Sequence, residues 1–332
     1  MSTCTSYATE DIGVVVIGRN EGELLTNCLA SIKASYIVYV DSGSVDGSAE
    51  AAERMGISVV RLDLAQPFTA ARARNEGVAY LRALQPDLRF VQFVDGDCAL
   101  VPGWLGTALS FLRQRKDVAI VCGRRRERHP EISVYNRLCD LEWNTPVGEA
   151  RACGGDSLVR VQAFEEVGGF LPTLIAGEEP ELCARLRERG WRIWRLDAEM
   201  TVHNAALSRF SQWWVRAVRS GYGYAQVSRL HIHSPFGIYR RQTSSAVVWG
   251  GVVPLAIGFG TLIHPAVIGG ALIYPIQISR IAILRGADVA QNWTYALFVM
   301  LAKFAELQGI LKFYWHRWCR HTVGLIEYKQ IS

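Results

Sequence analysis

The sequence contains no Cys-x-x-Cys pair and no zinc-finger spacing, and its eight cysteines are scattered over 332 residues. This distribution argues for reduced thiols rather than a disulfide framework or structural zinc. The first ten residues, MSTCTSYATE, lack a basic segment followed by an apolar one, so we expect no signal peptide. A formal charge of +5 is too small to indicate a nucleic-acid partner. Half of the residues are apolar, which excludes a disordered chain.

No Asp, Glu, Lys or Arg occurs between Gln242 and Ser279. Because a helix needs about 20 apolar residues to cross a membrane, this segment is long enough for two passes. We place them at Ala246–Ile263 and Ala266–Leu284, with Pro265 at the turn. A re-entrant or in-plane anchor, and a buried helical pair in a soluble protein, are the alternatives.

Basic residues stand at both ends of this segment: Arg240 and Arg241 precede it, and Arg280 and Arg285 follow it. A hairpin would put both ends on one side, which the positive-inside tendency makes cytoplasmic. We therefore expect the protein at the cytoplasmic face of the inner (cell) membrane, with the soluble domain that precedes the hairpin in the cytoplasm.

Aromatic and basic residues mark two further segments, about 208–230 and Trp293–Trp318, as interfacial amphipathic helices. The basic tail from His316 to Ser332 is expected at the headgroups. We place a soluble N-terminal domain at residues 1–240 and the membrane hairpin with its amphipathic helix at 241–332.

Apolar runs alternate with segments of helical spacing in the first hundred residues. Such alternation predicts a doubly wound, mostly parallel α/β sheet. The predicted strands are Ile12–Ile17, Tyr36–Val40, Ser58–Leu62 and Phe90–Val94, and the predicted helices are Glu23–Ala34, Ser48–Met55 and Pro67–Ala83. In such sheets ligands bind beyond the carboxyl ends of the strands, so the residues that follow each strand are candidates for a binding site.

Polar residues follow three of these strands. Arg19 and Glu21 come after the first, and Asp41 and Ser42 after the second, where an ordinary turn with a helix cap is the alternative. After the fourth strand, Asp95-Gly96-Asp97 places two carboxylates close enough to hold Mg²⁺ or Mn²⁺.

Two basic segments are further candidates. Arg72 and Asn75 lie in a predicted helix, where a guanidinium could contact phosphate oxygens or form a solvated basic face. The densest basic run, Arg124–Arg128, is expected to be a solvated loop, with contact to an anionic acceptor as the alternative.

The order of these motifs resembles family 2 glycosyltransferases of the GT-A fold. The matching pieces are VVVIGRNEGELLTNCLASI, YVDSGSVDGS, FTAARARNEG, FVDGDC, CGGDSLVRVQAFEEVGGF and GEEPELCARLRERGW. The resemblance implies that the loop after the second strand binds the nucleotide, that Asp95 and Asp97 hold the metal on the diphosphate, and that Gly155 and Asp156 line the sugars. It also implies Glu179 as catalytic base, with Glu178 as neighbour or substitute, and His203 as a metal ligand.

These residues lead us to expect an enzyme that moves a sugar from an NDP-sugar to a hydroxyl acceptor, metal-dependent and inverting. Family analogy and the apolar segment favour a lipid-linked saccharide of cell-surface polysaccharide as the acceptor. The alternatives are a nucleotidyltransferase of related fold and a non-catalytic membrane scaffold that retains the fold.

Overall fold

The computed structural model describes residues 11–66 and 68–319. These residues form two compact units. The first contains the residues up to 174 together with 178–208, and the second contains 175–177 and the residues from 209 onward. Each unit has its own core, and they are described separately below.

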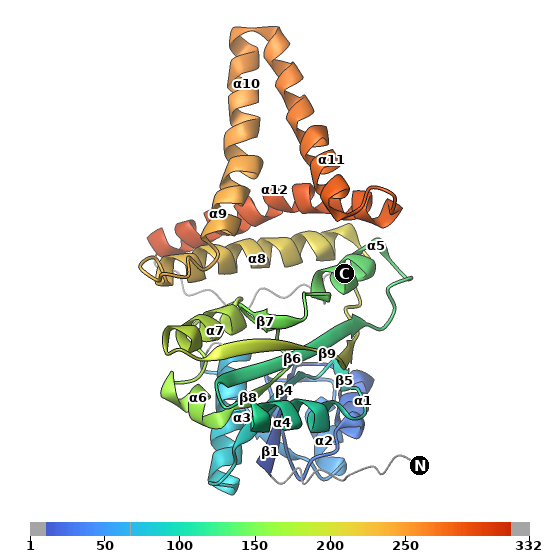
Figure 1. Ribbon diagram of the computed structural model, residues 1–332, viewed down its shortest axis with the longest axis vertical. Helices are drawn as coiled ribbons and strands as arrows, with labels where there is room; N and C mark the ends of the chain where they lie inside the picture. Colours follow the sequence, from blue (N-terminus) through green and yellow to red (C-terminus); the bar gives the residue numbers. More distant parts are fainter. Residues whose placement is uncertain (1–10, 67, 320–332) are drawn as a thin grey trace. The chain divides into compact units, whose positions relative to one another are not determined.

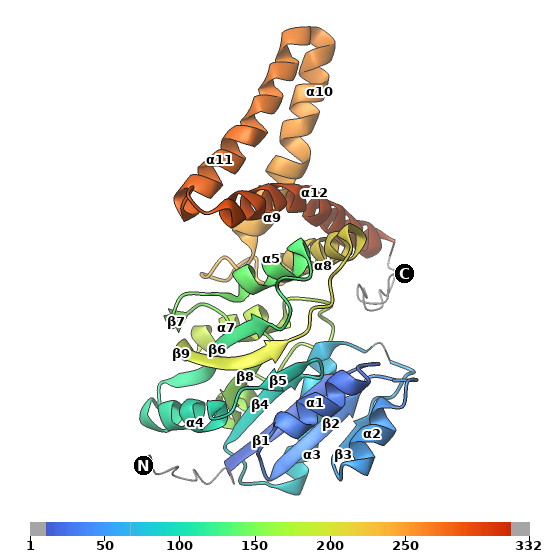
Figure 2. The ribbon, with the colours of Figure 1, turned by 90° about the vertical axis from the view of Figure 1, so that its right-hand side faces the viewer.

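The described part of the first unit is built on a nine-stranded sheet, in the order β3-β2-β1-β4-β8-β6-β9-β5, with β7 paired to β9 (Figures 1 and 2). The pairs β3–β2, β2–β1, β1–β4 and β6–β9 are parallel, and the pairs made by β8, β5 and β7 are antiparallel. The strands are β1 (Ile12–Gly18), β2 (Tyr36–Asp41), β3 (Ser58–Arg61), β4 (Phe90–Asp95), β5 (Cys98–Leu100), β6 (Val118–Glu127), β7 (Gly148–Ala150), β8 (Ser157–Arg160) and β9 (Arg192–His203).

Helices cover both faces of this sheet, which explains the unbroken apolar run of β1. Val14 and Val16 belong to one core cluster, which α1, α2 and α4 also line, and Val15 belongs to the other, with α3, α6 and α7. Both faces must therefore be apolar. The helices are α1 (Glu23–Ser31), α2 (Ser48–Arg54), α3 (Ala70–Leu84), α4 (Trp104–Gln114), α5 (Val134–Trp143), α6 (Val161–Glu166) and α7 (Glu178–Glu188). The expected doubly wound, mostly parallel α/β architecture is confirmed.

Helix α3 begins later than the expected start at Pro67. Thr69 is its N-cap, with extended backbone and a side-chain oxygen that accepts a hydrogen bond from the amide of Arg72 at 3.1 Å. A threonine in this position satisfies an amide that the first helical turn leaves without a partner.

The second unit is helical. Its elements are α8 (Phe210–Leu230), α9 (Arg240–Val247), the π-helical turn η2 (Val248–Val252), α10 (Val253–Ile263), the 3₁₀ helix η3 (Pro265–Leu272), α11 (Ile273–Arg285) and α12 (Ala290–Trp318). The chain from α9 to α11 forms a hairpin whose open end meets α12, as both views show. Two continuous helical stretches, Arg240–Ile263 and Pro265–Arg285, are long and apolar enough to cross a membrane.

Glycines let α8 and α12 pack backbone against backbone. A Cβ added to Gly221 would lie 2.0 Å from the carbonyl oxygen of Glu306, and one added to Gly309 would lie 2.0 Å from that of Val218. The ring centroids of Trp213 and Phe298 are 4.9 Å apart at the same interface. Because of this packing α8 groups with the C-terminal helices, whereas the sequence-based boundary at residue 240 assigned it to the N-terminal domain. The tail from 320 to 332 lies outside the described residues.

Candidate functional site

The loops after β1 and β2 are hydrogen-bonded to each other at the carboxyl end of the sheet. The side-chain oxygen of Asn20 accepts from the amide of Val45 at 2.8 Å, and the Asn20 amide donates to the Ser44 hydroxyl at 2.9 Å. Asn20 has a φ of 56°, a left-handed conformation that asparagine tolerates better than most residues. Three strand ends therefore meet here, because β1 lies between β2 and β4.

Asp41 is buried at the end of β2 and supports the loop that follows it. One carboxylate oxygen accepts from the Tyr39 hydroxyl, and the other accepts from the amides of Gly43 and Ser44, all at 3.0 Å. The amide of neighbouring Ser42 donates to the carbonyl of Gly18. Glu21 also lies at this edge, since its side chain would be 3.3 Å from a Cβ added to Gly96.

The predicted phosphate-binding Arg72 instead stabilises a loop. Its guanidinium donates to the carbonyls of Asp63 and Gln66 at 3.0 and 3.2 Å. Arg19 lies over the ring of Phe68, with 4.7 Å between the guanidinium carbon and the ring centroid. The side chains of both arginines thus contact the segment between β3 and α3.

Asp95 is held by two arginines that the sequence analysis did not select. Its carboxylate oxygens lie 3.0 Å from Nη2 of Arg74 and 3.1 Å from Nη2 of Arg125. Burial alone would raise the pKa of Asp95, but the two guanidinium groups outweigh it and hold the pKa below its usual value. The carboxylate is therefore ionised at neutral pH.

Arg74 lies on the face of α3 that packs onto the sheet, together with Ala71, Val78 and Leu81, and it is only 2% exposed. The spacing of these residues is helical, so an arginine on an otherwise apolar stripe was a signal present in the sequence. Arg125 gave no such signal. The expected solvated loop at 124–128 is wrong for residues 124–127, which belong to β6.

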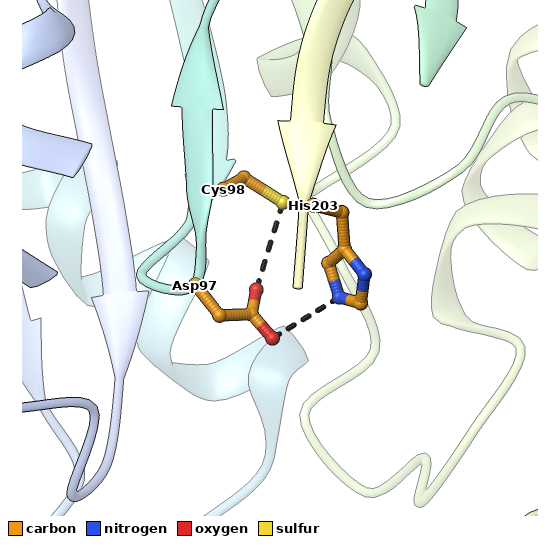
Figure 3. Close-up of side chains that lie close together, drawn as sticks. All are labelled: Asp97, Cys98 and His203. Carbon is orange, nitrogen blue, oxygen red and sulfur yellow. Dashed lines mark hydrogen bonds and ion pairs between the residues drawn. The ribbon is translucent and has the colours of Figure 1, made fainter. Parts of the chain in front are cut away.

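The carboxylate of Asp97 and the imidazole of His203 form a second pair of side chains in the site (Figure 3). Nε2 of His203, the last residue of β9, lies 3.0 Å from Oδ2 of Asp97, and both side chains are almost fully buried. The Cys98 thiol donates to the other oxygen of Asp97 at 3.5 Å. Burial raises the pKa of Cys98 well above its usual value, so this sulfur remains a neutral thiol.

Glu127 and Trp143 surround the imidazole of His203. Oε2 of Glu127 lies 3.5 Å from Nδ1 of His203 and accepts a hydrogen bond from the Ala205 amide at 2.9 Å. The Trp143 ring meets the imidazole edge to face at 4.7 Å, and the Arg125 guanidinium lies over the same Trp143 ring at 5.0 Å. These contacts fix the orientation of the imidazole.

Glu178 and Glu179 begin α7, as expected, and both contact Arg74. Their oxygens lie 3.1 and 3.0 Å from Nη1 of that arginine. Burial and the charge of Glu178 raise the pKa of Glu179 to about 7, although Arg74 opposes the shift. One guanidinium therefore connects the carboxylate of Asp95 with a glutamate whose pKa lies near neutral pH.

Asp156 and Asn75 have structural partners in this unit. Asp156 accepts from the Asp95 amide at 3.0 Å and from the Thr201 hydroxyl at 2.7 Å, and its side chain is fully buried. The Asn75 side chain donates to the carbonyl of Phe170 and accepts from its amide, at 2.8 and 2.9 Å. Asp156 thus fixes the backbone at Asp95, and Asn75 joins α3 to the segment that contains Phe170.

Gly155 lies directly against the ion pairs, and replacing it with alanine is expected to disturb them. An added Cβ would lie 2.7 Å from Nη2 of Arg74 and 3.0 Å from a carboxylate oxygen of Asp95. Overpacking typically costs about 1–3 kcal/mol, and a cost of this size that falls on the transition state lowers turnover by about 5- to 160-fold. Gly154→Ala is the matched control, because an added Cβ there meets no atom within 4 Å. Equal turnover of the two variants, with equal melting temperatures, would contradict this prediction.

Residues 13–167 match the family model described as glycosyl transferase family 2. The pre-mycofactocin glycosyltransferase of Mycobacterium tuberculosis is 25% identical, and the alignment covers 92% of this chain and 65% of that protein. The chain thus spans about two-thirds of the length of that relative. The succinoglycan biosynthesis protein ExoA of Rhizobium meliloti is 26% identical over 75% of this chain and 74% of its own length.

A solved structure shares the fold. It is the mannosyltransferase PcManGT from Pyrobaculum calidifontis in complex with GDP-Man and Mn²⁺, with a TM-score of 0.60, 18% identity, and coverage of 92% of this chain and 88% of that one. The family match begins within β1 and runs through the loops that carry Asp41, Asp95 and Asp156. The chain therefore matches glycosyl transferase family 2 over residues 13–167 and has the GT-A fold.

Proposed function

We propose that this protein is a metal-dependent, inverting glycosyltransferase that moves a sugar from an NDP-sugar to a hydroxyl acceptor. The observation that carries the proposal is the buried Arg74, which contacts Asp95 on one side and Glu178 and Glu179 on the other. Arg74 thus links a carboxylate that can serve a charged donor to a group that can accept a proton, beyond the carboxyl end of the sheet.

Asp95, Asp97 and His203 are the proposed metal ligands. Two neighbouring ligands of an octahedral ion with bonds of about 2.1 Å are about 3.0 Å apart, and Oδ2 of Asp97 lies 3.0 Å from Nε2 of His203. A carboxylate with an imidazole suits Mn²⁺, while Mg²⁺ prefers oxygen alone. When bound, the ion would stabilise negative charge on the departing nucleoside diphosphate.

Glu179 is the proposed catalytic base. A carboxylate whose pKa is about 7 can accept a proton from an attacking hydroxyl at neutral pH. A single displacement opposite the leaving group then inverts the anomeric centre. Glu178 lies beside it on the same arginine and raises its proton affinity.

The nucleotide is proposed to bind along the loops after β1 and β2, where Arg19, Glu21, Asp41 and Ser42 lie. The complex of PcManGT with GDP-Man and Mn²⁺ supports a nucleotide-sugar and a divalent ion for this fold. Arg72 is not proposed to bind phosphate, because its guanidinium donates to two carbonyl groups of a neighbouring loop. Arg74 and Arg125, which both pair with Asp95, are proposed as the cations that contact the donor phosphates.

The hairpin is proposed to cross the membrane, with the catalytic unit on the cytoplasmic side. In both candidate spans only 6% of the most apolar window is buried within the chain, whereas a core helix of a soluble protein would be mostly covered. The similarity to ExoA, a succinoglycan biosynthesis protein, supports a role in polysaccharide synthesis, and the apolar hairpin favours a lipid-linked saccharide as the proposed acceptor.

The product of donor turnover tests this function against its alternatives. Purified protein is incubated with a panel of nucleotide-sugars, with and without Mn²⁺, and the released nucleotide is measured. We expect nucleoside diphosphate, dependent on the metal. Released pyrophosphate would indicate a nucleotidyltransferase. No turnover of any donor, together with unaltered donor binding after Asp97→Asn, would indicate a scaffold.

A further inference from the structure

The second unit is strongly basic, although the whole chain is not. Residues 209–319 contain eleven Lys and Arg but only Asp288 and Glu306 as acids, against a net charge of +5 for all 332 residues. Glu306 is paired with Lys303 at 2.7 Å within α12. Most of the positive charge of this unit therefore has no carboxylate in its own unit to neutralise it.

Exposed arginines stand where the hairpin meets α12. Arg240 and Arg241 begin α9, and Arg280 and Arg285 lie in the last turns of α11. Arg240 donates to the carbonyl of Ile232, and Arg285 lies 4.0 Å from the ring centroid of Tyr295. Within residues 11–66 and 68–319, no ion pair is found for any of the four.

The apolar part of the same unit is also exposed. Leu262 and Ile263, near the hairpin tip, are 83% and 86% exposed. On α12, Leu311, Lys312 and Trp315 line an apolar groove of about 540 Å³. Aromatic side chains beside basic ones, next to a long apolar hairpin, are typical of the membrane–water interface.

We infer that this arginine collar, Arg240, Arg241, Arg280 and Arg285, binds the phosphate groups of anionic phospholipids. Charge complementarity selects this partner: an apolar hairpin alone would accept any bilayer, whereas four exposed guanidinium groups at its open end favour negative headgroups. Guanidinium binds phosphate oxygens with two parallel hydrogen bonds. The inference rests on the proposed membrane insertion of the hairpin.

Spin-labelled lipids test the inference in the full-length protein. The protein is reconstituted in phosphatidylcholine vesicles that contain a trace of phosphatidylcholine or phosphatidylglycerol labelled near the end of one acyl chain. The fraction of motionally restricted label gives the relative association of each lipid. We expect phosphatidylglycerol to be preferred by about fivefold at low salt, and less at high salt because the charges are screened.

Three double variants show whether the lipid preference depends on the charge of the arginine collar. Arg241→Gln with Arg280→Gln is expected to remove about half or more of the preference, and Arg241→Lys with Arg280→Lys is expected to retain it. Arg54→Gln with Lys116→Gln, which removes two exposed charges from the first unit, should change nothing. Equal restriction of both labels by the unaltered protein would overturn the inference while leaving membrane insertion intact. No restricted label of either kind would overturn insertion, and the inference with it.

Discussion

Asp97→Asn is expected to lower sugar transfer on the order of 10³-fold and to weaken Mn²⁺ binding, because a neutral amide replaces the charged carboxylate that we propose as a metal ligand beside His203. A metal that acts as a Lewis acid contributes several kcal/mol to the transition state, and each 1.36 kcal/mol is about tenfold in rate. Asparagine keeps the size of the side chain and can still hydrogen-bond to the imidazole. Turnover and a titration of free Mn²⁺ by electron paramagnetic resonance measure the two effects.

Asp117→Asn is the matched control for this variant. Asp117 is exposed and pairs with Arg115 and Arg192, away from His203. Its replacement should leave turnover and Mn²⁺ affinity unchanged. If Asp97→Asn kept full turnover and Mn²⁺ affinity while its melting temperature matched that of the control, the metal site would have to lie elsewhere.

Glu179→Gln is expected to lower kcat by about 10²–10⁴-fold, the usual contribution of a positioned base. The pH profile gives a second readout. With a pKa of about 7, Glu179 is protonated below that pH and cannot accept a proton. The rate of the unaltered enzyme should therefore rise as pH increases through about 7 and level off above it. The glutamine variant should lack this rise.

Glu178→Gln distinguishes the two acids on Arg74. Removing the charge of Glu178 removes one of the causes that raise the pKa of Glu179. We therefore expect a variant that keeps most of its turnover at high pH, with the rise of the profile shifted to lower pH. A large loss of kcat in Glu178→Gln, with a nearly unaffected Glu179→Gln, would reverse the assignment and make Glu178 the base.

Arg74 explains why these effects should be coupled. It is the common partner of Asp95, Glu178 and Glu179. A change on the donor side therefore alters the electrostatic environment of the base. The positive charge also offsets part of the repulsion among these three carboxylates, of which Glu178 is buried and the other two are partly buried; that repulsion would otherwise favour their protonated forms.

The sequence by itself determined the architecture of the first unit and the two apolar spans. An uninterrupted run such as IGVVVI fits only a strand that is covered on both faces, and a charge-free stretch from Gln242 to Ser279 fits few soluble folds. These signals are local. Asp95 and Asp97 were found in the same way, because they follow a predicted strand, whereas Glu178 and Glu179 were selected through the family resemblance.

Only the tertiary structure decided which arginines lie in the candidate site. It also decided that helix α8 belongs to the second unit. The choice of Arg74 over Arg72 depends on which face of α3 packs onto the sheet. Arg125 reaches Asp95 because the register between β6 and β9 shifts at 122/124 and again at 124/125, which breaks the alternation that sequence patterns assume. Helix α8 joins the C-terminal helices because Gly221 and Gly309 allow close backbone contact. Register shifts and long-range packing leave no periodic trace in the chain, and so they appear only once it has folded.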